Sequence, residues 1–162
     1  MANYYPPVSF FFEVKVAGAS GAVDASFAEV SGLDVERKTV ELAEGGENRF
    51  VHHLPGTVKH ANLVMKRGLM LASSHLFDWC KGTLESDLTR PIEPKDISVS
   101  LLNEKAEPMM TWSITGAWPV KWQIAAFRAR DNEVAMETLE MAFARIEREV
   151  NKPRGASGMF TA

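Results

Sequence analysis

The fold is decided by the stretch FFFEVKV at residues 10–16, in which apolar and charged side chains alternate. Phe12, Val14 and Val16 share one side of an extended chain, and the two charged residues between them take the other side. Successive side chains of a β-strand point to opposite faces, so this alternation predicts a strand with one buried face. The same alternation recurs at residues 97–101, which predicts a second strand of this kind.

Other parts of the chain show the strand pattern and are separated by turn residues. The acidic, glycine-containing stretch at residues 44–48 predicts a hairpin tip or a loop, because adjacent glycines adopt positive φ at little cost. Leu54-Pro55-Gly56 predicts another turn. The remaining predicted strands cover residues 26–30, 33–42, 49–54, 58–65 and 109–118.

One helix is predicted in the middle of the chain, over residues 69–81. Leu69, Leu76 and Trp79 fall near a common face at the helical period, and Gly82 stands where helices commonly end.

The last element, at residues 133–150, fits two structures. Its apolar residues recur at a helical spacing, which by itself favours a helix. A strand would need a bulge near residues 137–138 to bring the later apolar residues to a common face. The apolar stripe consists of Met136, Leu139, Phe143, Ile146 and Val150.

Length and composition are those of a single globular domain. The chain has 162 residues, 46% hydrophobic and 24% charged, which suits one domain over residues 1–150. The stretch at residues 151–162 contains Pro153 and a Gly-Ala-Ser-Gly run, and it predicts a flexible or partner-dependent tail.

Charge and targeting patterns exclude several partners. The net charge is −3, so no basic field is available for sequence recognition of nucleic acid. Residues 1–16 lack the pattern of a signal peptide, and their apolar run is far shorter than the roughly 20 residues of a spanning helix. We therefore expect synthesis in the cytoplasm and no direct membrane insertion.

No pattern in the sequence predicts catalysis, a metal site or a cofactor site. His53 and His60 could share one face if a turn separated them, which suggests a metal-dependent hydrolase as one hypothesis. No third ligand lies at a suitable spacing, and zinc usually takes at least three protein ligands, so we set this hypothesis aside. Cys80 lies in an apolar part of the predicted helix and is expected to be a buried structural thiol.

Charges of both signs alternate along the last element. Glu137, Glu140 and Arg145 belong to this set. The set is either a solvated face or a face that contacts another subunit or lines a lumen, since mixed charges keep a wall wet and non-sticky.

Six blocks, in order, carry a resemblance to a known family. Together they resemble the tail tube proteins of contractile phages and of phage-like contractile injection systems, and they cover roughly residues 8–148. The blocks are FAEVSGLDVE (27–36), EGGEN (44–48), LPGTVK (54–59), NLVMKRG (62–68), AWPVKW (117–122) and NEVAMETLE (132–140).

The resemblance implies a mainly β, tail-tube or Hcp-like fold. Two antiparallel sheets would close into a barrel-like body with one short flanking α-helix at about residues 69–81. The resemblance also places a strand at residues 133–146, and we adopt that strand in place of the helix. Pairing with a neighbouring subunit can override local propensity.

The same resemblance implies a structural protein rather than an enzyme. Six subunits would form a ring, and stacked rings would form a hollow inner tube driven by a contractile sheath. The alternative is a tube-related adaptor that forms a single ring, docks the spike or baseplate, or carries cargo. The expected partners are other copies of the chain, the sheath, the baseplate or spike and the tube cap, with protein cargo in the lumen as a further candidate. The expected location is an assembled particle, either a virion tail or an extracellular or anchored injection particle.

Two sets of residues are expected at contacts between subunits. The loop at residues 44–48 would reach the adjacent ring, where its acids would meet basic residues of a neighbour. The ring-contact set is Glu44, Gly45, Gly46, Glu47, Asn48, Lys59, Lys66 and Arg67. The lumen or subunit-contact set is Glu137, Glu140 and Arg145.

Overall fold

A computed structural model describes residues 11–18, 25–43, 45–46, 51–69, 74–125 and 135–151. Ten strands and one helix are found in this part of the chain. Of the predicted tail at residues 151–162, all but Asn151 lies outside the described residues. The elements are β1 (Phe11–Val16), β2 (Ala25–Phe27), β3 (Glu29–Ser31), β4 (Val35–Leu42), β5 (His52–His60), β6 (Leu63–Gly68), α1 (His75–Leu84), β7 (Lys95–Leu102), β8 (Pro108–Ile124), β9 (Met136–Ala142) and β10 (Arg145–Val150).

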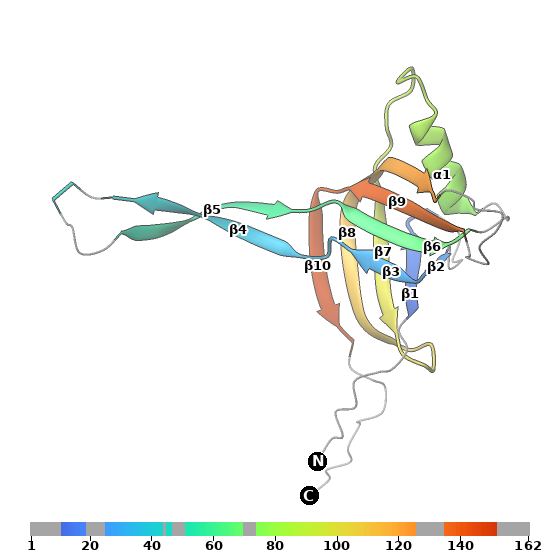
Figure 1. Ribbon diagram of the computed structural model, residues 1–162, viewed down its shortest axis with the longest axis horizontal. Coiled ribbons are helices and arrows are strands. Elements are labelled where there is room, and N and C mark those ends of the chain that lie inside the picture. The colour runs from blue at the N-terminus through green and yellow to red at the C-terminus, as the bar shows by residue number, and fades with distance from the viewer. Residues whose placement is uncertain are drawn as a thin grey trace, which may run out of the picture.

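Two antiparallel sheets make the body, as predicted, and the long strand β8 belongs to both (Figure 1). One sheet runs β2-β1-β7-β8-β10, and the other runs β8-β9-β6-β3. β8 pairs with β7 up to Ala117 and with β9 from Trp118 onward. Gly116, at φ 67°, lies two residues before Trp118, where the pairing with β9 begins.

The core lies between the two sheets and under α1. The alternation quoted at residues 12–16 is confirmed, because Val14 and Val16 are buried and Lys15 is exposed. Ile97 and Val99 of β7 lie on the same inner face. β1, β6, β7 and β9 thus each contribute alternate residues to the inner layer.

The last element consists of strands, as the resemblance implied, and the helical spacing was misleading. β9 and β10 meet at a corner formed by Phe143 and Ala144, so the apolar stripe is divided between two strands. The bulge expected near residues 137–138 is wrong, because β9 pairs with β6 without interruption. Glu137 itself takes an inward position, in line with Leu139 and Met141.

The predicted helix exists, but its limits were wrong. α1 begins six residues later than predicted and continues beyond Gly82, which lies inside it. Ser74 is the N-cap, and its side-chain oxygen accepts a hydrogen bond from the backbone N–H of Phe77 at 3.2 Å. This cap satisfies a backbone donor that has no partner within the helix.

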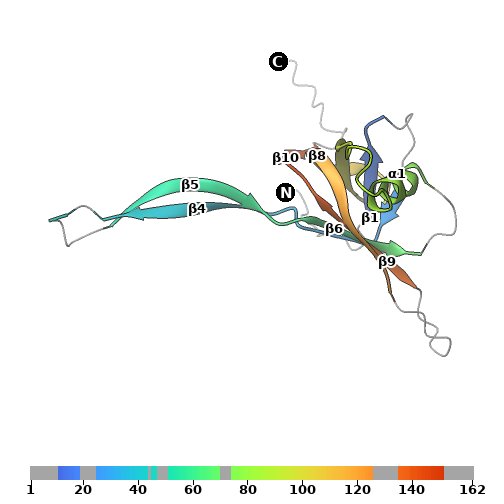
Figure 2. The same ribbon diagram turned by 90° about the horizontal axis from the view of Figure 1, so that it is seen from above.

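β4 and β5 form an antiparallel hairpin that projects from the body (Figures 1 and 2). We call residues 35–60 the arm. The turn predicted at Leu54-Pro55-Gly56 is wrong, because β5 runs through it without interruption. Each strand of a two-stranded hairpin has a free outer edge, where a proline without an N–H is tolerated.

Candidate assembly surfaces

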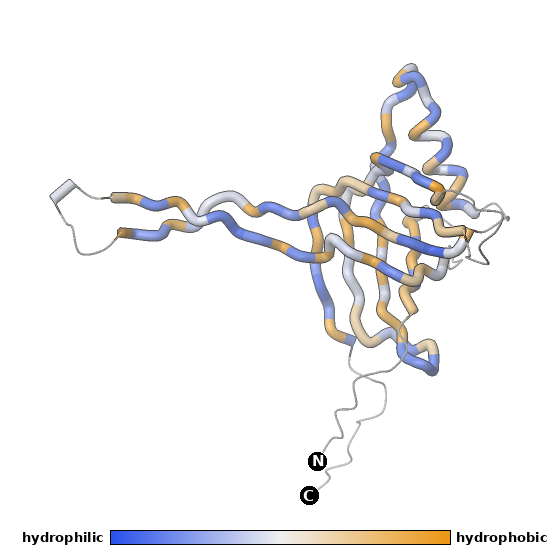
Figure 3. Tube along the Cα trace, in the orientation of Figure 1, coloured by the Kyte–Doolittle hydropathy of each residue, from blue (hydrophilic) through white to orange (hydrophobic). Residues whose placement is uncertain are grey.

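The arm exposes apolar side chains that the body does not cover. β4 and β5 pair with each other and with no third strand among the residues that the structure describes. Figure 3 shows apolar and polar residues interspersed along both strands. Apolar residues at 45–56% exposure are Val35, Val40, Leu42, Val51, Leu54 and Val58.

The outer half of the arm has one apolar face. Val40 lies directly opposite Leu54, and Leu42 lies opposite His52. Directly opposite residues share a face, so these side chains lie together, whereas the pair of Glu41 and His53 takes the other face. The sequence contained the alternation that produces this face, but gave no sign that the face lacks a second layer.

The predicted hairpin tip at residues 44–48 connects β4 to β5. Gly45 and Gly46 form a turn, and Gly46 has φ 109°. No atom lies within 4 Å of a Cβ built on either glycine, so another backbone could approach this part of the tip closely. Glu44, Glu47 and Asn48 lie outside the described residues.

The basic residues of the predicted ring-contact set do not form one cluster. Lys59 lies on the exposed arm opposite Glu36. Lys66 donates a hydrogen bond to Glu29 Oε1 at 3.0 Å across β6 and β3. Arg67 points to the opposite face of β6, into the core, because adjacent strand residues alternate between faces.

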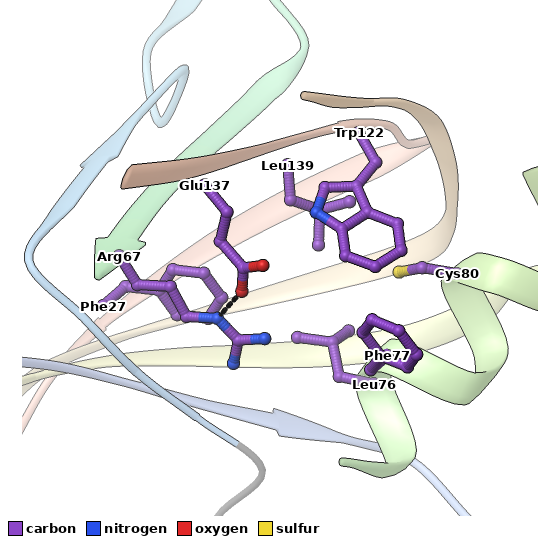
Figure 4. Close-up of a pocket in the computed structure, with 8 residues that line it drawn as sticks. All are labelled: Phe27, Arg67, Leu76, Phe77, Cys80, Trp122, Glu137 and Leu139. Atoms are coloured by element: carbon purple, nitrogen blue, oxygen red, sulfur yellow. Dashed lines mark hydrogen bonds and ion pairs between the residues drawn. The ribbon is translucent and has the colours of Figure 1, made fainter. Parts of the chain in front are cut away.

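Arg67 and Glu137 form an ion pair inside the subunit (Figure 4). The two residues are 6% and 3% exposed and lie directly opposite each other on β6 and β9. Their burial speaks against contacts with another subunit, so neither remains in our interface sets. Lys66 and Arg67 were expected in one contact set because they are adjacent in the sequence, but they lie on opposite faces of β6.

The surroundings of this pair are largely apolar. The Arg67 guanidinium carbon lies 5.3 Å from the centre of the Phe27 ring, and α1 covers the site with Leu76 and Cys80. Arg67 Nη1 has no hydrogen-bond partner in the described part of the chain. A cavity of about 10 Å³ beside it is at the lower limit for a single water.

The other two residues of the predicted lumen or contact set remain accessible. Glu140 lies on β9, and its Oε1 accepts a hydrogen bond from Asn62 Nδ2 at 2.8 Å. Arg145 begins β10, is 73% exposed at its side chain, and pairs with Glu147. These residues belong to different sheets and do not form one cluster.

β10 ends one sheet and leaves one of its edges unpaired in the described residues. Five of its six residues are exposed, and four of these five are charged. An exposed edge presents backbone N–H and C=O groups that another chain can pair with, while charges discourage indiscriminate pairing.

The described residues do not bring together a catalytic or metal-binding arrangement. His53 and His60 are seven residues apart on β5, roughly 23 Å along an extended strand, which is too far for both to bind one metal ion. No group of three or more His, Cys, Asp or Glu side chains suited to a metal occurs in the part of the chain that the structure describes. Among those residues, no helix is both long and apolar enough to cross a membrane.

Comparisons with solved structures identify relatives in contractile particles. A chain of the 6-fold symmetrised baseplate of the anti-feeding prophage is 29% identical, with a TM-score of 0.71 over 90% of this chain and 97% of that chain. A chain of the extended sheath-tube complex of an extracellular contractile injection system is 28% identical, with a TM-score of 0.73 over 93% and 95%. A chain of the anti-feeding prophage tube-terminating cap is 25% identical, with a TM-score of 0.75 over 93% and 95%.

The search of curated proteins returned no match. The family model of the T4-like virus tail tube protein gp19 matches residues 8–147, which is most of the chain. The match agrees with the two-sheet body and with the structural relatives. The chain therefore belongs to the T4-like virus tail tube protein family.

Proposed function

We propose that this tail tube protein builds a hollow inner tube from rings of six copies, and that the arm joins each copy to another. The observation that carries the proposal is the exposed apolar face of the arm, at Val40, Leu42 and Leu54. An isolated two-stranded hairpin is at best marginally stable in water. Burial against a second copy would cover this face and stabilise the arm at about 25 cal/mol per Å².

The tip of the arm supplies a second, electrostatic contribution. Acids at Glu44 and Glu47 would meet Lys59 or Lys66 of a neighbouring copy, while Gly45 and Gly46 allow its backbone to come near. Arg67 is omitted because it is buried with Glu137. Lys66 already pairs with Glu29, so its contact would be an exchange or a shared pair.

Ring closure would use the edges of the body. β10 offers a six-residue edge with its own Arg145–Glu147 pair, which can specify the register of an approaching strand. The count of six is supported by the six-fold symmetry applied to the related baseplate. In a closed ring, this edge of each copy would pair with a different edge of its neighbour, which removes the exposed edges that favour aggregation.

The partners follow from the particles in which the relatives occur. A sheath would surround the tube, and a cap and a baseplate or spike would bind its ends. Protein cargo would occupy the lumen. The chain would act as part of an assembled particle, which is the setting of all three relatives.

The adaptor remains the second candidate, because one relative is a chain of a baseplate. A chain of this kind would form a single ring between the tube and the spike. Electron microscopy of the purified chain separates the two functions, since stacked rings or hollow filaments indicate a tube and isolated rings indicate an adaptor.

Variants of the arm test the proposed contact. Val40→Asp and Leu54→Asp place charges on the apolar face, and we expect them to shorten or abolish tubes. Leu88→Asp is the matched control, because Leu88 is 76% exposed on the body, outside the arm. Charge reversal at Glu44 and Glu47 tests the tip in the same way. Tubes of normal length in the arm variants would contradict the proposal.

A further inference from the structure

Two short segments, residues 32–34 and 60–62, join the strands of the arm to the body, and we call them the arm root. Gly32 has φ 84°, and a Cβ built on it would lie 2.0 Å from the backbone oxygen of Asn62. The two segments therefore touch through their backbones. This contact leaves little room for one segment to slide over the other.

His60, at the inner end of β5, rests on the corner between β9 and β10. Its ring is stacked on Phe143, with ring centres 4.1 Å apart and planes at 12°. Its Nε2 lies 3.4 Å from the carbonyl oxygen of Ala144, at the long end of hydrogen-bond distances, and donates to it in the Nε2–H tautomer. Phe143 is 7% exposed, so an arm side chain is packed directly on the edge of the core.

The corner under His60 is itself firmly held. The backbone N–H of Ala144 donates to Thr115 O at 3.0 Å. A Cβ built on Gly116 would lie 3.4 Å from the Ala144 Cβ, which shows how closely β8 approaches the corner. The N–H of Gly116 in turn donates to Asp96 Oδ1 at 3.0 Å. The contact of His60 is thereby connected to both β7 and β8.

A second contact holds the root from the outer face of β9. Asn62 Nδ2 donates to Glu140 Oε1 at 2.8 Å. His60 and Asn62 thus attach the root at two points of the β9–β10 segment. Two separated attachments resist rotation of the arm about its root.

We propose that His60 is a positioning residue that fixes the direction in which the arm leaves the body. The proposal rests on the proposed function, because a fixed arm presents its apolar face to another copy without a search over orientations. Preorganisation of this kind reduces the entropy lost on association. The contact with a second copy is made by the outer arm, and His60 acts through the root.

The direction of the arm can be measured without assembly. Spin labels at T39C, on the arm, and E104C, on the turn after β7, give an inter-label distance distribution; Cys80 is 2% exposed and does not compete for the label. Labelled chain is diluted into an excess of unlabelled chain, so that each signal comes from one copy. Variants are H60A, H60F, which keeps a stacking ring, and H53A, the control histidine further out on the same strand.

We expect a narrow distribution in the unsubstituted chain and in H53A, a broad one in H60A, and recovery in H60F. The protein concentration at which tubes first form should rise roughly two- to tenfold in H60A, the equivalent of one lost aromatic pair, and recover in H60F. An unchanged distribution in H60A, or equal broadening in H60F, would overturn the proposal. The distance readout remains decisive even if the unsubstituted chain forms no tubes, a result that would count against the proposed function alone.

Discussion

Loss of one partner of the buried Arg67–Glu137 pair should destabilise the subunit far more than loss of an exposed pair. Arg67→Met leaves a carboxylate, and Glu137→Met leaves a guanidinium, inside the core under α1. Arg67 already has one donor nitrogen without a partner, so removal of Glu137 would leave the group with little beyond the ring of Phe27. We expect a loss of about 3–5 kcal/mol in the free energy of unfolding for each single variant.

The size of this effect follows from burial. Two unit charges about 4 Å apart attract by about 4 kcal/mol at an effective dielectric constant of about 20, but by only about 1 kcal/mol in water. The double variant with methionine at both positions removes both desolvation costs. Replacement of a buried pair by apolar residues is often neutral or stabilising by about 1–4 kcal/mol, so the double variant should recover most of the loss.

Urea unfolding at one fixed subunit concentration measures these differences, since self-association adds to apparent stability. The control is the neighbouring pair of Lys66 and Glu29, on the outer face of the same sheet, with side chains 40% and 57% exposed. Its single methionine variants should cost less than about 1 kcal/mol. Single losses at Arg67 or Glu137 as small as those of the control would refute the reasoning, as would a double variant no more stable than either single variant.

Three other substitutions test local features of the body. Gly32→Ala should cost at least about 2 kcal/mol, because φ is positive and the new Cβ would clash with Asn62; Gly18→Ala, with positive φ but open space, should cost less, as thermal unfolding can show. Ser74→Ala removes the N-cap of α1 and should cost about 0.5–2 kcal/mol, with faster amide exchange in the first turn. Leu76→Ala should cost about 2–5 kcal/mol in urea unfolding, because Leu76 is 1% exposed; a smaller loss would indicate that α1 settles into the space.

The body of the fold could be predicted from local pattern because its alternation matches its burial. Val14 and Val99 alternate with polar neighbours, and each lies where the pattern places it. The limits of α1 could have been predicted better from Ser74, a preferred N-cap residue directly before the helix. Gly82 was misleading, because a glycine can lie inside a helix at a cost of about 1 kcal/mol.

The last element could not be predicted from periodicity because a corner interrupts it. Leu139 and Phe143 are four residues apart, as on a helix, but one lies within β9 and the other at its end, where the chain turns into β10. Glu137 was counted with the polar residues, although it occupies a core position. Its charge is compensated by Arg67, which lies 70 residues earlier, and no pattern near Glu137 in the sequence indicates this pairing.

The wrong prediction of a turn in β5 also reflects a contact with a residue distant in sequence, here in the opposite strand β4. A register shift lies between Arg37 and Thr39, and a Cβ built on Gly56 would lie 2.8 Å from the carbonyl oxygen of Lys38. Gly56 is therefore needed for close approach of two backbones inside a continuous hairpin, and not for a reversal of the chain. A Pro-Gly pair looks the same in the sequence whether the chain reverses there or continues as a strand.

In the arm, an alternating sequence pattern does not correspond to a buried face in the single subunit. Val40 and Leu42 alternate with polar residues as core strands do, yet both are about half exposed in the subunit. An alternating strand normally has a layer against its apolar face, and for the arm the proposed layer is another copy of the chain. On that proposal the pattern describes the assembled tube, and the amides of β4 and β5 should exchange more slowly after assembly than in the single subunit, where the arm is already formed but its apolar face is uncovered.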